Sequence, residues 1–424
     1  MTLPVRAQAS QAGRPPGTRP VELPVPRGAA LYIGALLGPG LLLLPGLAAK
    51  TAGPASILAW LALLGLSGLL AIVFAAFGRE VPSASGAAGY AQAGLGRAAG
   101  ALTRTWFLAG VVTGAPIVCL VGAGYVAGLT GGGQATRAAV AAAMLAALIA
   151  LAAGGVRSAT FVQLVLVTLL IAVIVVAVTG SATAARAANW APFLPHGWTS
   201  VGRAASVLML SFVGWEAVAP LTSRFADPDR QLPKVIGIAF AVTSLLYLGL
   251  AVAVVASLGR SGTADVPLAR LLALAVGPAG NAVAAGAAVV LTLGSVNAYL
   301  SGSVQMTGSR LRVLPLVAAC GLVVLGLFGL GAVNTAALVE VPTAMFVCVY
   351  VACLAAAVRL LAGRARLAAA AALPAVATIL VFCGWSALPA VATGLAVLAS
   401  GLRRRRPQLP GLSHSWHPRA DHTR

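Results

Sequence analysis

Charged residues are scarce in this chain of 424 residues: they make up 8% of it, and only eight residues are acidic. A soluble globular domain carries about 25% charged residues, so the composition excludes an ordinary water-soluble fold. Hydrophobic residues make up 60% of the chain, and its mean hydropathy is +0.97. We therefore predict an all-α integral membrane protein in a lipid bilayer.

Several groups on which enzymes depend are also missing from the apolar stretches. No histidine lies in them, and the phosphate-binding pattern GxxxxGK[ST] does not occur, which argues against ATP-driven chemistry in this chain. The five cysteines form no CxxC pair, so we expect them to be buried, reduced and structural. We expect no cofactor and no metal site, and a membrane-embedded enzyme is the less favoured alternative to a transporter.

The net charge of +20 does not predict nucleic acid as a partner, because the basic residues are spread between apolar runs. Twelve of these runs approach the ~20 residues that a membrane-spanning helix needs. With the N-terminus in the cytoplasm, 22 of the 28 Lys and Arg residues fall on the cytoplasmic side, as the positive-inside rule requires. The predicted spans are residues 29–49, 54–77, 104–128, 135–153, 160–180, 203–222, 235–258, 282–308, 313–332, 335–360, 368–384 and 387–402.

This pattern predicts one transporter-like membrane domain at residues 28–402, placed in the cell membrane with both chain ends in the cytoplasm. Residues 1–27 and 403–424 are rich in Pro, Gly and Arg, and we expect them to be disordered tails. We expect no signal peptide, because the first apolar run is too long for one and should remain as a membrane anchor. The sequence does not predict the oligomeric state.

The first predicted span contains YIGALLGPGLLLLPG, in which Gly38, Pro39 and Gly40 interrupt an apolar helix at mid-membrane depth. Broken backbone survives in a bilayer only where protein, water or a ligand satisfies its polar groups. The interruption is therefore either a packing kink, helped by the GxxxG of Gly34 and Gly38, or a ligand site that uses the dipoles of the two half-helices.

A second interruption favours the ligand site. Gly214 and Pro220 bracket Glu216 in the span at 203–222, five spans after the first interruption. Two broken helices in corresponding positions of two halves indicate the binding site of a transporter. We predict a 5+5 inverted repeat with broken helices 1 and 6, in which the halves are residues 28–180 and 200–360 and two extra helices occupy 368–402.

Five stretches resemble the amino acid–polyamine–organocation permeases, in the order that this family shows. They are IGALLGPGLLLLPGLAAKTAGPASILAW, FGREVPSASGAAGY, WAPFLPHGW, SFVGWEAVAPLTSRFADPDRQLPK and VNAYLSGSVQMTGSR. Within the family, the second and fourth stretches resemble bacterial exporters of L-methionine and branched-chain amino acids. Pro39 departs from the pattern, because the family usually has a small hydroxyl residue or glycine there.

The resemblance implies a LeuT-like fold that binds an amino acid at the two unwound segments. The residues implied are Gly34, Leu37, Gly38, Pro39 and Gly40 in the first segment and Ser211, Phe212, Gly214 and Trp215 in the second. Phe212 and Trp215 could form the wall of a side-chain pocket or pack against lipid and other helices. Thr113 and Asn297 are candidate polar contacts, although such residues often bond neighbouring helices instead.

Glu216 and Glu340 are the acidic residues that lie within predicted spans. A buried carboxyl group takes up a proton more readily than an exposed one, so either glutamate could couple transport to protons. The alternatives are a neutral Glu216 that hydrogen-bonds across the helix break, and a Glu340 that lies in water near the outer end of its span. Sodium is a second candidate ion, through Ser295 or Ser301 and the carbonyls of the breaks.

The sequence thus predicts secondary active transport of neutral, hydrophobic amino acids such as Met, Leu, Ile and Val, by alternating access and with proton-coupled efflux. An importer of the same fold, driven by protons or sodium, is the alternative. A channel or scaffold would not need two matched helix breaks.

Overall fold

The computed structural model describes residues 24–38, 40–81, 86–154, 160–215, 225, 227–259 and 266–404, and these residues are helical in all their regular elements. Pro39 and Glu216, two of the predicted site residues, lie outside these ranges. The α-helices are α1 Val25–Leu36, α2 Gly40–Ala52, α3 Ser56–Glu80, α4 Gly86–Leu95, α5 Arg97–Thr130, α6 Gln134–Gly154, α7 Thr160–Gly180, α8 Trp198–Leu208, α9 Pro228–Ala253, α10 Pro267–Val276, α11 Ala279–Thr307, α12 Arg310–Gly329, α13 Thr335–Leu360, α14 Gly363–Phe382 and α15 Leu388–Arg404.

Nine helical stretches in the described part of the chain are long and apolar enough to cross a membrane. Long helices account for nine of the predicted spans, namely α3, α5, α6, α7, α9, α11, α12, α13 and α14. The remaining three predicted spans coincide with shorter pieces: α1 with α2, α8 with the 3₁₀ turn η5 (Met209–Phe212), and α15. The chain is therefore a multi-pass membrane protein in which helices are interrupted where the sequence concentrates Gly and Pro.

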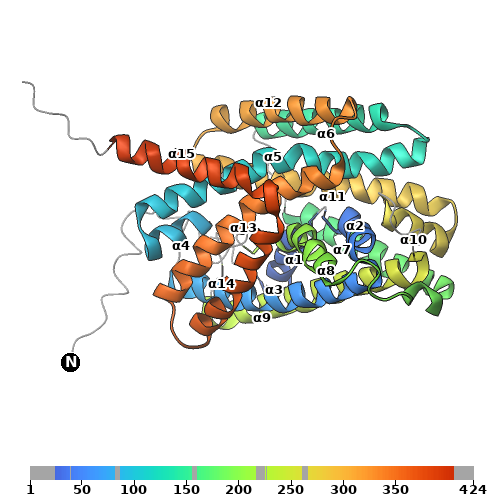
Figure 1. Cartoon of the computed structure of the whole chain (residues 1–424), viewed down its shortest axis with the longest axis horizontal. Helices are drawn as coiled ribbons and strands as arrows, with labels where there is room; N and C mark the ends of the chain where they lie inside the picture. The colour runs from blue at the N-terminus through green and yellow to red at the C-terminus, as the bar shows by residue number, and fades with distance from the viewer. Residues whose placement is uncertain are drawn as a thin grey trace, which may run out of the picture.

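α5 is the central helix of the bundle and packs against α4, α6, α11, α12 and α13. In its most apolar window, 72% of the residues are buried, against 28% in the corresponding window of α6. Figure 1 shows α6 and α12 side by side along one edge of the bundle, with α1, α2 and α8 near its middle. Burial thus distinguishes helices that form the core from helices whose apolar side chains are left for lipid.

The two halves of the first span pack against different partners. α1 lies against α7 and α9, whereas α2 lies against α8. The interruption between them therefore falls where two groups of helices meet, and this position makes the broken segment available to the interior of the bundle.

The link into α9 forms a regular helix start. Asp227 is its N-cap and accepts a hydrogen bond from the backbone N–H of Arg230, with Oδ1 3.3 Å from the nitrogen. Pro228 occupies the first helical position, where its missing N–H costs nothing. The motif Asp-Pro after the second interrupted span thus fixes the point at which the chain re-enters a helix.

Candidate functional site

The first interruption is a tight turn between α1 and α2. Leu37 has φ −73° and ψ 65°, the backbone angles of an inverse γ-turn. The N–H of Gly38 donates to the carbonyl of Leu36 over 2.8 Å, and the N–H of Leu41 donates to the carbonyl of Gly38 over 3.2 Å. The turn thus ends α1 at Leu36 and separates it from the start of α2 at Gly40.

The second interruption begins where η5 ends at Phe212. Val213 is extended, with φ −73° and ψ 131°, and Gly214 has φ +150°, in the region that favours glycine. The residues that follow, including Glu216 and Pro220, lie beyond the described part of this segment. The described residues nevertheless show that the helix does not continue past Phe212.

The two interruptions touch each other. A Cβ placed on Gly214 would lie 2.8 Å from the carbonyl oxygen of Ala35, at the end of α1. A Cβ on Gly40 would lie 2.8 Å from the hydroxyl of Ser211. Glycine at both positions therefore allows the two backbones to approach within contact distance, as a shared binding site requires.

Three buried tyrosines supply hydrogen bonds to the interrupted segments. The Tyr247 hydroxyl lies 2.6 Å from the carbonyl oxygen of Leu36 and 2.7 Å from that of Ser211, so it joins the two breaks. The Tyr350 hydroxyl donates to the Phe212 carbonyl and accepts from the Gly214 N–H, both over 3.2 Å. These contacts satisfy backbone groups that lipid could not satisfy.

The third tyrosine acts on the other side of the first break. The hydroxyl of Tyr125, on α5, donates to the carbonyl of Leu42 over 2.6 Å and accepts from the N–H of Leu268 over 3.3 Å. It therefore fixes α2 to both α5 and the start of α10.

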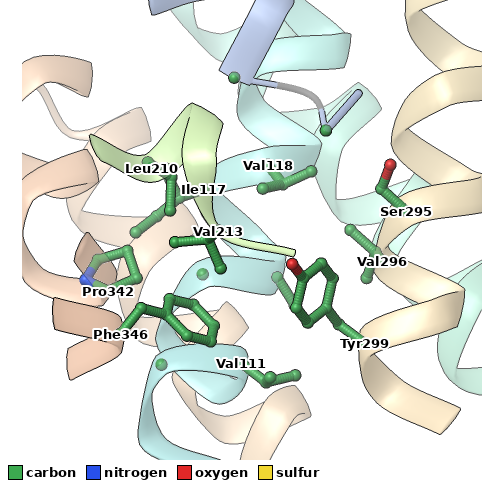
Figure 2. Close-up of a pocket in the computed structure, with 15 residues that line it drawn as sticks. Val111, Ile117, Val118, Leu210, Val213, Ser295, Val296, Tyr299, Pro342 and Phe346 are labelled. Atoms are coloured by element: carbon green, nitrogen blue, oxygen red, sulfur yellow. The ribbon is translucent and has the colours of Figure 1, made fainter. Parts of the chain in front are cut away.

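A pocket lies beside the two breaks, and we call it the central pocket. Its volume open to the centre of a water molecule is about 60 Å³. Figure 2 shows Val213, Tyr299 and Phe346 around this space, with Ser295 on the opposite wall from Phe346. The lining residues are Gly38, Gly40, Gly110, Val111, Gly114, Ala115, Ile117, Val118, Leu210, Val213, Ser295, Val296, Tyr299, Pro342 and Phe346.

The chemistry of this lining is apolar, with polar groups at its margin. Ser295 and Tyr299, both on α11, contribute the side-chain hydroxyls. Gly38 lies at the edge of the break, and a Cβ built on it meets no atom within 4 Å, so that face of the turn borders open space. The pocket can therefore take a small group with an apolar side chain and offer backbone dipoles to its charged end.

The predicted site residues fall into two groups. Gly38 and Gly40 line the central pocket, whereas Gly34 lines a smaller apolar cavity between α1, α7 and α11 that shares Ser295 with it. Leu37 is fully buried in the core. Pro39 lies outside the described residues.

The predicted aromatic pair lies behind the pocket and is not part of its lining. Phe212 packs against Trp60 and Tyr247, with ring centroids 5.9 and 5.4 Å away. Trp215 is fully buried, and its ring N–H donates to the hydroxyl of Ser67 over 3.0 Å. Val213, which lies between them in the chain, lines the pocket instead.

The remaining predicted residues are near the pocket without lining it. Ser211 is buried against Gly40 at the contact between the breaks. The hydroxyl of Thr113 donates to the carbonyl of Ala109 in its own helix over 2.8 Å. Asn297 lies on α11 between the lining residues Val296 and Tyr299.

Glu340 is not among the residues that line the central pocket. Its carboxylate accepts a hydrogen bond from the hydroxyl of Ser386 over 2.8 Å, and Ser386 belongs to the link between α14 and α15. Pro342, two residues later, does line the pocket. The contact therefore connects the C-terminal helices to a helix that forms a wall of the site.

Sequence reasoning missed most of the walls, which come from α5, α11 and α13. Gly110, Gly114, Tyr299 and Phe346 are examples. Because these helices are apolar on every face, hydropathy does not distinguish the side that faces the pocket from the side that faces lipid. The spacing of Gly110 and Gly114 is the one signal that could have indicated a face open to a ligand.

The sequence comparison decides the family. Residues 26–307 match the family model described as amino acid permease. The chain belongs to the amino acid permease family. The family that the five motifs indicated is therefore confirmed, and the relatives are permeases and transporters rather than enzymes.

Two bacterial relatives span nearly the whole chain. The uncharacterized amino acid permease YecA of Bacillus subtilis is 32% identical over 391 residues, which cover 86% of this chain and 92% of YecA. The L-methionine/branched-chain amino acid exporter YjeH of Escherichia coli is 28% identical over 393 residues, which cover 87% of this chain and 93% of YjeH.

The fold is shared with a solved transporter. The crystal structure of MhsT in complex with L-phenylalanine superposes with a TM-score of 0.59 and covers 87% of this chain and 100% of that chain. At 17% identity this likeness shows the fold alone. The permease therefore has a LeuT-like fold, which is the fold that the family resemblance implied.

Proposed function

We propose that this permease is a secondary active carrier of neutral, apolar amino acids, and that it works by alternating access. The observation that carries the proposal is the meeting of two interrupted helices beside a pocket with apolar walls. Interrupted helices at mid-membrane depth are the usual way in which transporters of this architecture hold a substrate.

The half-helices supply the groups that a zwitterion needs. The C-terminal end of α1 presents carbonyls, which attract an ammonium group, and the N-terminal end of α2 presents N–H groups, which attract a carboxylate. The predicted contacts Gly34, Leu37, Gly38, Pro39 and Gly40 form this segment, and Ser211, Phe212, Gly214 and Trp215 complete it. No charged side chain among the described lining residues is needed for this recognition.

The walls of the central pocket favour an aliphatic or thioether side chain. Val111, Val213 and Phe346 present only carbon atoms to the substrate. This chemistry suits Met, Leu, Ile or Val, and the name of the relative YjeH points to the same substrates. We propose export as the direction on the same basis.

We further propose that the chain crosses the cell membrane twelve times with both ends in the cytoplasm. The basic residues support this topology through their one-sided distribution. Two five-helix units of opposite orientation, at 28–180 and 200–360, would place the breaks in corresponding positions, with residues 368–402 outside the repeat.

Protons are the proposed coupling ion, and Glu216 is the residue proposed to carry them, because it lies in the interrupted segment at 203–222. Glu340 contacts Ser386 and not the pocket, so its role in coupling would be exerted through the packing of α13. Sodium bound near Ser295 is the competing hypothesis.

A flux assay in proteoliposomes tests the proposal. Radiolabelled Leu, Met, Ala and Arg are offered in turn, with an imposed pH gradient, an imposed sodium gradient, or neither. We expect the pH gradient to drive Leu and Met, with little movement of Arg. Transport of Arg but not Leu, or of no amino acid at all, would refute the substrate class.

The coupling ion is tested separately with Glu216→Gln, and Glu340→Gln tests the second candidate glutamate in the same assay. We expect Glu216→Gln to abolish accumulation driven by the pH gradient while leaving exchange of labelled for unlabelled Leu in place. If Glu216→Gln keeps full pH-driven accumulation, Glu216 is not the proton carrier. If only a sodium gradient drives the wild type, protons are excluded as the coupling ion.

A further inference from the structure

The last helix, α15, follows the two five-helix units proposed above and packs against α5 and α13. Figure 1 shows α15, in red, beside α5. α5 and α13 bring Gly110, Val111, Pro342 and Phe346 to the central pocket. α15 is therefore in contact with two helices that form walls of the pocket, and it can act on the pocket through them.

α15 uses one narrow face for this packing. Ala390 and Gly394 are buried and Thr393 is half-buried, at the i, i+3 and i+4 spacing of a single helix face. Val391 and Leu395, on other faces, are 53% and 62% exposed, as side chains directed to lipid would be. Because the buried face consists of small residues, α15 can approach its neighbours closely.

Trp106 on α5 packs against this face of small residues. Its ring Nε1–H donates to the carbonyl of Ala390 over 2.8 Å. A Cβ built on Gly394 would lie 3.2 Å from Cζ2 of the same ring, so a larger residue there would press on the indole. A hydrogen bond of this length tolerates little displacement, and the contact therefore fixes how α15 lies on α5.

The same part of the chain is attached to α13 at two points. Ser386 lies in the 3₁₀ turn η9 (Gly384–Ala387), which precedes α15, and donates to the Glu340 carboxylate over 2.8 Å. In α15 itself, the Thr393 hydroxyl lies 4.0 Å from the sulfur of Met345. We call residues 384–394 the brace, because they join α5 to α13 and none of them lines the central pocket.

The contacts of the brace lie close to residues that do line the pocket. Trp106 is four residues before Gly110 on α5, and Met345 immediately precedes Phe346 on α13. A Cβ on Gly110 would lie 3.0 Å from Cε2 of Phe346 and 3.3 Å from the Cβ of Met345. Figure 2 shows the Phe346 ring at the wall of the pocket, next to Pro342. The position of this ring therefore depends on how closely α5 and α13 approach each other.

We propose that the brace sets the separation of α5 and α13, and thereby the size of the side chain that the central pocket accepts. Trp106 and Gly394 are then positioning residues for substrate selection, since neither lines the pocket. Without the bond from Trp106 to Ala390, the two helices can separate, and the Phe346 ring loses its close contact with Gly110. The volume open to a water centre is only about 60 Å³, so a small gain in width favours larger side chains over Leu. The choice of substrates rests on the proposed function, whereas the separation of the helices does not.

Transport by the full-length protein in proteoliposomes tests the selection. Initial rates are measured over a range of concentrations of labelled Leu and Phe. Trp106→Phe keeps a ring and removes the N–H donor, and Gly394→Ala places a methyl against the indole and so moves α15 away from α5. In both variants we expect the KM for Phe to fall relative to the KM for Leu by about 3-fold or more. A variant that merely leaves less folded protein lowers the maximal rate for both substrates and keeps the ratio of their KM values.

Two variants are matched controls. Trp385→Phe makes the same exchange at a tryptophan of the brace that is 86% exposed. Gly286→Ala adds a methyl on α11 at a position where a Cβ meets nothing within 4 Å. Both controls should keep the wild-type ratio of the two KM values. The proposal fails if Trp106→Phe also keeps that ratio, or if Trp385→Phe changes it equally.

The separation of α5 and α13 is measured without any substrate, by electron paramagnetic resonance on the full-length protein in lipid nanodiscs. Spin labels are attached through Arg104→Cys on α5 and Arg359→Cys on α13, both at exposed positions. Cys320 and Cys348, which are half-buried, are first replaced by serine so that they take up no label.

We expect a longer or broader distance distribution between the labels when Trp106→Phe is added, and the unaltered distribution when Trp385→Phe is added. An unaltered distribution with Trp106→Phe would overturn the proposal, even if the KM ratio changes. Altered separation in a protein whose wild type carries no amino acid would refute the proposed function and leave the spacing role of the brace standing.

Discussion

The central pocket differs in the origin of its polarity from a larger cavity at one end of the bundle, which residues of α2, α5, α6, α12 and α13 line and which we call the end cavity. The central pocket is lined by glycines and apolar side chains, and its polar character comes mainly from the ends of two broken helices. The end cavity carries Lys50 and Arg137 as well as helix ends. A charged side chain at the bilayer centre costs about 2.5–3.5 kcal/mol on insertion scales, whereas main-chain dipoles bring no net charge. The comparison teaches that a site deep in the membrane favours main-chain dipoles as its polar groups, whereas a site nearer the surface can also use charged side chains.

The largest effect is expected from Gly214→Ala, which attacks the contact between the two breaks. The new Cβ would lie 2.8 Å from the carbonyl oxygen of Ala35, on a backbone with φ +150°. Overpacking of this kind costs about 1–3 kcal/mol, so we expect a lower unfolding midpoint and at least ~10-fold slower leucine flux. Gly237→Ala is the control, because a Cβ at Gly237 meets nothing within 4 Å. Normal flux in Gly214→Ala would show that the contact is not required.

The next effect is expected from Tyr247→Phe, which removes the hydroxyl that joins Leu36 to Ser211. A single O–H donates to one carbonyl at a time, and leaving a buried carbonyl without its donor costs about 1–3 kcal/mol. We therefore expect lower thermal stability together with weaker substrate binding. Tyr90→Phe is the matched control, because the Tyr90 hydroxyl is buried and has no hydrogen-bond partner among the described residues. If stability and substrate binding fall equally in both variants, the effect comes from the loss of any buried tyrosine hydroxyl and not from the Tyr247 contacts.

A smaller and selective effect is expected from Gly114→Ala in the wall of the central pocket. The added methyl would sit 3.4 Å from Pro342, which is ordinary contact distance, so the fold should tolerate it. Because the methyl takes up space in a pocket of about 60 Å³, we expect the KM for leucine to rise several-fold more than the KM for alanine. Initial rates measured over a range of leucine and alanine concentrations give both KM values. An equal rise in KM for the two substrates would show that Gly114 does not select substrates by size.

The positions of the breaks could be predicted from sequence because their cause is local. Gly38, Pro39 and Gly40 cannot continue an α-helix without cost, and Gly214 permits a φ that other residues avoid. The long helices could be predicted for a similar reason, since a span must be apolar for about 20 residues. These features depend on what each residue does to its own backbone.

The direction in which side chains point near the breaks could not be predicted. For Phe212 and Trp215 the sequence left open a pocket wall or packing against lipid and other helices. The 3₁₀ turn and the extended Val213 change the rotation of the chain, so that Val213 lines the pocket. Tyr299 and Phe346 were missed because lipid and pocket both favour apolar residues. The sequence identified Arg137 only as one of the basic residues on the outer side. Its buried position could not be predicted, because the side chain packs against Gly124 and Phe328, which are distant from each other in sequence.

The tyrosine hydroxyls connect α1 and α2, the two halves of the first span, to different parts of the bundle. Tyr125 ties α2 to α5 and α10, while Tyr247 ties the end of α1 to the end of η5. If α1 tilts about the turn at Leu37, the Tyr247 hydroxyl transmits the movement to the end of η5, whereas α8 stays packed on α2. Opening on one face of the membrane would then bend both broken spans at their existing interruptions, with no new break in a helix.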